Sequence, residues 1–366
     1  MASRCDLKCD YCYVYQMADR SALRQPRFMS ERTLTQGAER IAEHATAHHL
    51  TSVSVVFHGG EPLLAGPAYL ARAARTLRDR LPAPMRLDLR VQTHGGLLDD
   101  EILTTLAEHQ IMVGVSLDGG PEQHDRHRRR ADGRGTFAQT AAGLDRLLSK
   151  RFRALFSGLL CVVDLENDPV GVYEGLLGFA PPTIDFLLPH ANWTAPPTGH
   201  PAGGDAPYGR WLTTAFDRWY DAAPQETAVR LFQDIIQLYL GGHGSTEQVG
   251  LSPAEFVVID TDGALQQVDT LKSVRAGAAE TGLHVRTHTM DQVLEHPGVQ
   301  ARQRGLAGLS ETCRHCSLVN VCGGGAYVHR YDHATGFDNP SVYCRDMQHL
   351  IRHITRRVDE DLRKLR

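Results

Sequence analysis

The sequence predicts an α/β fold in which parallel strands alternate with helices. Short runs rich in Val, Leu and Ile recur along the first half of the chain, as expected for buried parallel strands. Amphipathic stretches of helical length separate these runs. With 366 residues, of which 42% are hydrophobic, the chain is long enough for two domains with sizeable cores. The alternation fits either a barrel or an open doubly wound sheet.

The elements follow in order along the chain. The expected strands are Val53 to Phe57, Leu87 to Val91, Ile111 to Ser116, Leu155 to Val163 and Ile184 to Leu188. The expected helices between them are Thr33 to His48, Asp99 to Gln110 with Asp99 as N-cap, and Thr136 to Arg151. After a loop rich in Pro, Gly and Thr come two helices, a β-hairpin and a last helix: Tyr208 to Tyr220, Gln225 to Leu240, Phe256 to Val268 with its turn at Thr261-Asp262-Gly263, and Arg345 to Leu365.

Composition excludes several functional classes. The net charge of -4 and the pI near 6.5 give no bulk attraction for nucleic acid or for an anionic membrane. The one dense basic run, residues 127–130, is interpreted as a solvated loop. No apolar stretch reaches membrane-spanning length and no signal peptide is visible, so we expect a cytoplasmic protein with neither nucleic acid nor membrane as a partner.

The eight cysteines are clustered. Three lie near the N-terminus, four near the C-terminus and Cys161 lies alone within an apolar strand, where a packing role is expected. In a large cytosolic chain such clusters predict metal ligands before disulfides.

The N-terminal group has the spacing C-x3-C-x2-C, formed by Cys5, Cys9 and Cys12. Three thiolates around a four-iron cluster leave one iron open, and an open position distinguishes a reactive centre from a closed structural one. A zinc loop completed by a distant ligand is the alternative. A second motif, residues 58–62 (HGGEP), follows the strand that ends at Phe57. Its Gly59 and Gly60 allow close approach of the backbone to a ligand, and Glu61 can face a ligand's ammonium group.

These two segments resemble the radical S-adenosylmethionine (SAM) superfamily, as do residues 91–95 (VQTHG) and 113–119 (VGVSLDG). The resemblance implies a partial (β/α)6 barrel with a SAM-binding 4Fe-4S cluster on Cys5, Cys9 and Cys12. It also implies SAM contacts at the carboxyl ends of the strands: Gln92 and Ser116 at the ribose, and Arg126 or Arg128 at the carboxylate. His94 stands where the family commonly has Asn. Only four residues precede Cys5, where the family has its first strand, so a trimmed chain, a wrong start or an incomplete barrel is expected.

The C-terminal group consists of Cys313, Cys316, Cys322 and Cys344, enough thiolates to close a second site. By spacing alone, a zinc ribbon and an iron-sulfur cluster are equally good interpretations. The segment resembles the SPASM extension of peptide-modifying radical SAM enzymes, which implies a C-terminal SPASM-type iron-sulfur domain. Ala326 replaces one cysteine of that pattern, and the hairpin around Gly263 has none. We therefore expect one auxiliary 4Fe-4S cluster, with the other lost.

Longer segments, such as residues 184–193 (IDFLLPHANW) and 322–344, resemble the FxsB branch of these proteins. That resemblance implies crosslinking of a short ribosomal precursor peptide, with an aromatic ring carbon joined to a β-carbon in a cyclophane. An external one-electron donor such as flavodoxin or ferredoxin is implied as a partner, and Asp118 and Asp269 are candidate bases. The expected domains are residues 1–194 (barrel), 195–250 (linker and helices), 251–344 (auxiliary cluster) and 345–366 (helix).

Two alternatives are kept. One is anaerobic sulfatase maturation, in which a Cys or Ser side chain becomes formylglycine, although the lost auxiliary cluster is expected to count against it. The other is a zinc-ribbon binding module without catalysis.

Overall fold

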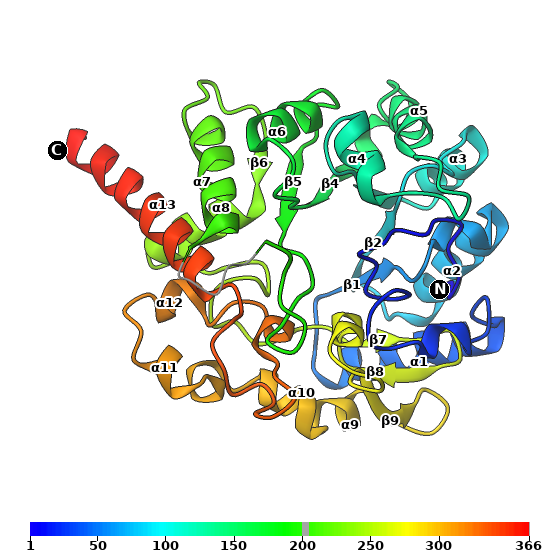
Figure 1. The fold of residues 1–366 in the computed structure, drawn as a ribbon. Helices are drawn as coiled ribbons and strands as arrows, with labels where there is room; N and C mark the ends of the chain where they lie inside the picture. Colours follow the sequence, from blue (N-terminus) through cyan, green and yellow to red (C-terminus); the bar gives the residue numbers. More distant parts are fainter. Residues whose placement is uncertain (200–204, 366) are drawn as a thin grey trace. The chain divides into compact units, whose positions relative to one another are not determined.

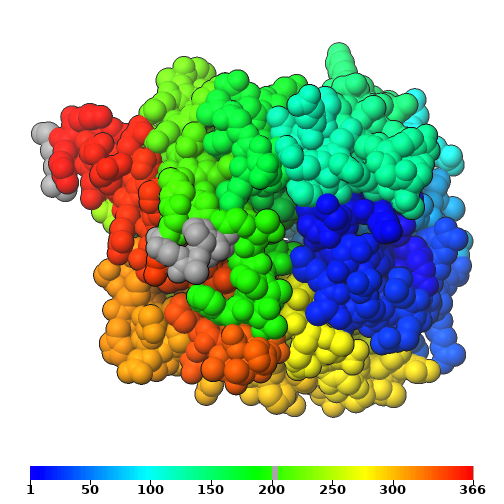
Figure 2. Space-filling model, viewed as in Figure 1, coloured from blue at the N-terminus to red at the C-terminus, as the bar shows by residue number. Residues whose placement is uncertain are grey.

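The computed structural model describes residues 1–199 and 205–365, which form two compact units. The first unit comprises residues 1–117, 121–159 and 256–299, and the second comprises the remaining described residues. The N-terminal cysteines and the hairpin segment therefore share one unit, although more than two hundred residues separate them in the sequence. Figure 2 shows this within the first unit, where the yellow surface of residues 256–299 lies directly beside the blue N-terminal surface.

Six strands form one sheet in the order β1-β2-β3-β4-β5-β6. They are β1 Ser52–Phe57, β2 Arg86–Thr93, β3 Ile111–Ser116, β4 Phe156–Val162, β5 Thr183–Leu187 and β6 Ala228–Val229. Pairing is parallel between β1 and β2, between β2 and β3, and between β5 and β6. The predicted α/β fold with a parallel sheet is confirmed, and the first five strands coincide with the predicted hydrophobic runs. The short strand β6 lies within a predicted helix.

The helices of the first unit are α1 Glu31–Ala47, α2 Pro67–Arg80, α3 Asp100–Glu108, α4 Pro121–His127, α5 Phe137–Leu147 and α9 Met290–Leu294 (Figure 1). Their starts follow local capping chemistry. Ser30 caps α1 by accepting a hydrogen bond from the Thr33 amide. Asp99 caps α3 by accepting one from the Ile102 amide, as predicted.

The helices that lie wholly within the second unit are α6 Pro169–Leu177, α7 Pro207–Tyr220, α8 Arg230–Tyr239, α11 Glu311–Arg314, α12 Val319–Cys322 and α13 Cys344–Lys364. Helix α10, Pro297–Arg302, begins in the first unit and ends in the second. The long helix α13 packs against α7 and α8. A side chain at Gly209 of α7 would meet the backbone of Asp346, so glycine permits this close approach. No described helix is long and apolar enough to cross a bilayer.

The hairpin belongs to a small antiparallel sheet in the first unit. Its strands are β7 Val258–Ile259, β8 Ala264–Gln266 and β9 Glu280–His284, and β9 was not predicted. Gly263 in the turn has a φ of 98°, which favours glycine. Leu265, Val285 and Val293 form a buried cluster here, against which Ile41 of α1 packs. The hairpin, α1 and α9 are thereby held together (Figure 1).

Candidate active site

The N-terminal cysteine loop is held against the end of β1 by the two predicted glycines. The Gly60 amide donates to the Ala2 carbonyl at 2.8 Å, and the Glu61 amide donates to the Arg4 carbonyl at 2.9 Å. A Cβ at Gly59 or Gly60 would lie 2.1 to 2.2 Å from those same carbonyl oxygens. Glycine is therefore required here because the backbone of residues 2–4 packs directly on Gly59 and Gly60. This contact fixes the position of the chain just before Cys5.

Glu61 is buried beneath the cysteine loop and stabilises the end of β1. Its carboxylate is only 1% exposed and accepts three hydrogen bonds of 2.9 Å, from the Leu63 amide, the Thr93 hydroxyl and the His94 amide. These bonds connect the end of β1 with the end of β2. The expected contact of Glu61 with the SAM ammonium group stays a prediction.

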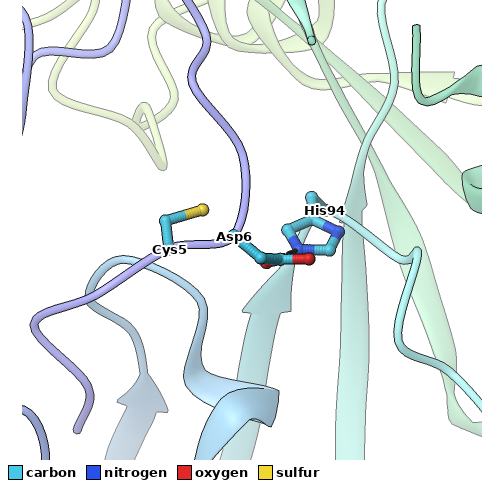
Figure 3. A group of neighbouring side chains, drawn as sticks. All are labelled: Cys5, Asp6 and His94. Carbon is cyan, nitrogen blue, oxygen red and sulfur yellow. Dashed lines mark hydrogen bonds and ion pairs between the residues drawn. The ribbon is translucent and has the colours of Figure 1, made fainter. Parts of the chain in front are cut away.

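His94 connects the end of β2 with the cysteine loop. Figure 3 shows the Asp6 carboxylate turned toward the His94 ring, with Cys5 beside it. His94 Nδ1 accepts a hydrogen bond from the Gly96 amide, so the proton is on Nε2, which donates to Asp6 at 2.9 Å. Burial lowers the pKa of His94, but the nearby Glu61 and Asp6 carboxylates outweigh burial and raise it. Where the family usually has Asn, this chain has a histidine that forms an ion pair with Asp6 of the cysteine loop.

The residues expected at SAM meet at the neighbouring strand ends. Gln92 on β2 donates a hydrogen bond to Ser116 on β3 at 3.0 Å. Arg128 is buried, and its guanidinium lies 5.4 Å from the centre of the Tyr11 ring in the cysteine loop. Arg126 is exposed. Arg128 therefore lies against the loop.

The residues fit a cluster. Burial raises the pKa of the Cys5 thiol, and so do the nearby charges of Glu61, Asp6 and Cys9. Burial also raises the pKa of Cys12. Buried thiols whose ionised forms repel one another need a cationic metal centre to become ligands. None of the three forms a disulfide in the structure.

Sequence reasoning missed a network of three polar side chains beside this loop. Tyr13 donates a hydrogen bond to Asp269 Oδ2 at 2.8 Å, and His58 Nε2 lies 2.8 Å from the same oxygen. Burial would raise the pKa of Asp269, but the neighbouring His58 and the hydrogen bonds from His58 and Tyr13 hold it well below its usual range. Tyr13 follows Cys12 directly and His58 is the first residue of the HGGEP motif, but 211 residues separate His58 from Asp269.

The other candidate base has a different setting. Asp118 is buried and belongs to the second unit, where its Oδ1 accepts a hydrogen bond from the Val162 amide at 3.0 Å. This is the structural role that such an aspartate commonly has.

Cys161 is fully buried in β4, as expected for a cysteine with a packing role.

Around Gly263, where cysteine ligands are absent, the hairpin carries a different polar group. Lys272 and Asp260 form a buried ion pair at 3.4 Å, and Gln266 donates a hydrogen bond to the same Asp260 oxygen at 2.9 Å. Lysine, aspartate and glutamine side chains thus lie in this part of the hairpin segment, where cysteine ligands are absent.

The four C-terminal cysteines gather in the second unit. Burial raises the pKa of Cys322 to about 12, and the nearby thiols of Cys344, Cys313 and Cys316 add to this shift. The four thiols are therefore close enough to affect one another's ionisation, as expected for ligands of one metal centre.

Arg330 supports this second site. Its guanidinium donates hydrogen bonds to the carbonyls of Gly323, Gly324 and Gly325 at 2.7, 3.1 and 2.7 Å. These glycines follow Cys322 directly and have φ values of 60°, 80° and 70°. Arg330 therefore holds the three glycines after Cys322 in their left-handed backbone conformation.

Comparison with known proteins agrees with this chemistry. The model of the radical SAM superfamily matches residues 1–169. An uncharacterized protein of Synechocystis is 30% identical over 353 residues, which cover 94% of this chain and 86% of that protein. The chain belongs to the radical SAM superfamily, and its cofactors are SAM, the SAM-binding 4Fe-4S cluster and one auxiliary 4Fe-4S cluster.

More particular relatives are known. The cysteine-type anaerobic sulfatase-maturating enzyme of Clostridium perfringens is 25% identical over 341 residues, covering 88% of this chain and 86% of that enzyme. The serine-type enzyme of Klebsiella aerogenes is 25% identical over 331 residues, covering 89% and 77%. The solved structure of native anSMEcpe with bound AdoMet superimposes with a TM-score of 0.85 at 21% identity, covering 100% of this chain and 98% of that one. This likeness confirms the radical SAM fold with its C-terminal extension.

The predicted crosslinking activity is wrong. The characterised relatives reported above, which align along most of the chain, are sulfatase-maturating enzymes, so the comparisons support the alternative expectation of formylglycine formation. The FxsB branch and cyclophane chemistry find no support among them. The error has a physical cause: missing hairpin cysteines remove cluster ligands, but they leave Asp269, Tyr13 and His58 in place.

Proposed function

We propose that this protein oxidises the β-carbon of a cysteine or serine side chain in a peptide, producing the aldehyde formylglycine. The observation that carries the proposal is the ionised Asp269, hydrogen-bonded to Tyr13 beside the cysteine loop. Similarity to cysteine-type and serine-type sulfatase-maturating enzymes supports it.

The reaction removes two electrons and two protons from the side chain. When bound, SAM and its cluster supply a 5'-deoxyadenosyl radical that takes one β-hydrogen atom, and the auxiliary cluster supplies an acceptor for the second electron. What remains is the proton of the thiol or hydroxyl group. This chain must provide a group that accepts it.

Asp269 suits this role because its two oxygens differ. Oδ2 accepts a hydrogen bond from Tyr13 and lies within hydrogen-bonding distance of His58. Among the described residues, none donates a hydrogen bond to Oδ1, so that oxygen can take the substrate proton. The low pKa of Asp269 keeps it ionised, and burial raises the pKa of Tyr13, which stays a donor. The His58 side chain is 38% exposed, so the hydrogen-bonded group of Tyr13, His58 and Asp269 reaches solvent.

The partners follow from the same chemistry. A structure of native anSMEcpe contains AdoMet and the Cp18Cys peptide, and it superimposes on this chain with a TM-score of 0.84 at 22% identity. We infer that a short peptide segment is the substrate here too. A one-electron donor of the flavodoxin or ferredoxin class would reduce the SAM-binding cluster.

The proposal is tested with the reconstituted protein, SAM, a reductant and two peptides that differ only in Cys or Ser at one position. Conversion lowers the peptide mass by about 18 Da from cysteine, after hydrolysis releases sulfide, or by about 2 Da from serine. Because loss of about 2 Da has other causes, the product is also treated with an aminooxy reagent, which labels only an aldehyde. Turnover of SAM without labelled peptide from either substrate would contradict the proposal.

A further inference from the structure

Two histidines and an aspartate form a separate group on the surface of the first unit. His44 and His48 lie one turn apart at the C-terminal end of α1, and Asp291 lies in the first turn of α9. Asp291 Oδ1 is 2.6 Å from His44 Nδ1 and 2.8 Å from His48 Nε2. The two imidazole rings are tilted, with their centroids 4.4 Å apart. One donor atom from each residue lies within 4.8 Å of the other two.

The elements that carry these residues are firmly held. Residues four apart share one face of a helix, so α1 presents both imidazoles in the same direction. Arg40 of α1 donates a hydrogen bond at 2.9 Å to the carbonyl of Val285, which directly follows β9. Helix α9 begins with a capping box between Thr289 and Gln292. The donors therefore come from two elements whose packing is set by other contacts.

The donor set selects a class of ion. Imidazole suits zinc, copper and nickel, whereas calcium and magnesium require mainly oxygen ligands. Asp291 adds one carboxylate oxygen, Oδ1, to the two imidazole nitrogens. The side chains of His44, His48 and Asp291 are 25%, 48% and 46% exposed, which leaves room for water as a further ligand.

We propose that His44, His48 and Asp291 bind a borderline divalent transition-metal ion such as Zn²⁺, which ties α1 to α9. Tetrahedral zinc with bonds of about 2.0 to 2.2 Å separates neighbouring donors by about 3.4 Å. The present separations of 2.6 and 2.8 Å increase to that value through side-chain rotations that shift the donors by less than about 1 Å. The bound ion would take the place of the two hydrogen bonds that His44 and His48 now make to the same oxygen, Oδ1 of Asp291.

The test is a calorimetric titration of the cluster-loaded protein with Zn²⁺, and separately with Mg²⁺. We expect one equivalent of Zn²⁺ to bind and to raise the midpoint of thermal unfolding, with no binding of Mg²⁺. His44→Ala and Asp291→Asn should each weaken Zn²⁺ binding at least tenfold. Asp291→Asn preserves the shape of the side chain, so its effect cannot be attributed to misfolding. His288→Ala is the control, because His288 lies outside this group and instead hydrogen-bonds with the His284 amide and the Thr287 hydroxyl.

X-ray absorption at the zinc edge separates this site from the cysteines. Nitrogen and oxygen neighbours at about 2.0 to 2.1 Å support the proposal, whereas sulfur at about 2.3 Å would assign the ion to thiolates and overturn it. Zn²⁺ binding that is unchanged in both His44→Ala and Asp291→Asn, or no binding at all, would overturn it equally.

Discussion

Replacing Asp269 by Asn tests the proposed proton acceptor. The amide has nearly the shape of the carboxylate and can still accept a hydrogen bond from Tyr13, but it has no charge and cannot take a proton. Loss of a positioned general base costs about 10² to 10⁴ in rate. At about 1.36 kcal/mol per factor of ten, this raises the barrier by about 2.7 to 5.4 kcal/mol.

The assay compares two products from the same reaction. Asp269→Asn should still release 5'-deoxyadenosine from SAM, because the cysteine loop is untouched, while aldehyde formation falls at least a hundredfold relative to it. Asp262→Asn, in the turn of the preceding hairpin, is the matched control, since its Oδ1 accepts a hydrogen bond from the Ala264 amide. Aldehyde formation within tenfold of the wild-type rate in Asp269→Asn would refute the role of this residue.

The pH dependence follows from the same carboxylate. The folded-state pKa of Asp269 lies below the unfolded value of about 3.9, so its ionisation stabilises the folded protein above that value. This contribution is lost only as the pH falls through the lower folded-state pKa. The wild-type protein should therefore keep its proton acceptor from about pH 8 down to about pH 5.

Three further substitutions have defined outcomes. Changing Cys5, Cys9 and Cys12 together to Ala should abolish reductive SAM cleavage and reduce bound iron from about eight to about four atoms per chain, and retained 5'-deoxyadenosine formation would contradict the ligand assignment. Glu61→Gln should destabilise the first unit by about 1 to 3 kcal/mol in denaturant unfolding, since its amide group would face the buried His94 N–H. Arg330→Gln should lower the iron content toward four atoms while SAM cleavage continues, and an unchanged iron content would show that the glycine turn does not need Arg330.

Local signals in the sequence were sufficient for much of the fold. Buried parallel strands are continuous apolar runs, so the first five strands could be located closely. The cap of α3 was visible because Asp99 precedes an amphipathic segment. Strand β9 was missed because its sequence, ETGLH, is polar and contains Gly282, so only its pairing with β8 defines it.

The active site was predictable to the extent that it follows motifs. The cysteines and the glycine pair have fixed spacing, whereas the network of Tyr13, His58 and Asp269 joins three distant segments through tertiary folding. The same limit applies to function. The absence of cysteines from the hairpin indicates how many iron-sulfur clusters the protein binds. It does not indicate whether a proton acceptor such as Asp269 lies beside the N-terminal cysteine loop.

The most direct test of the proposed function follows a β-hydrogen. A peptide whose reacting Cys or Ser carries deuterium at the β-carbon is incubated with the reconstituted protein and SAM, and both products are analysed by mass spectrometry. The proposal predicts that deuterium enters 5'-deoxyadenosine, with one aldehyde formed for each labelled molecule. Deuterium that enters 5'-deoxyadenosine without any aldehyde in the peptide, or an aldehyde formed without transfer of the label, would contradict it.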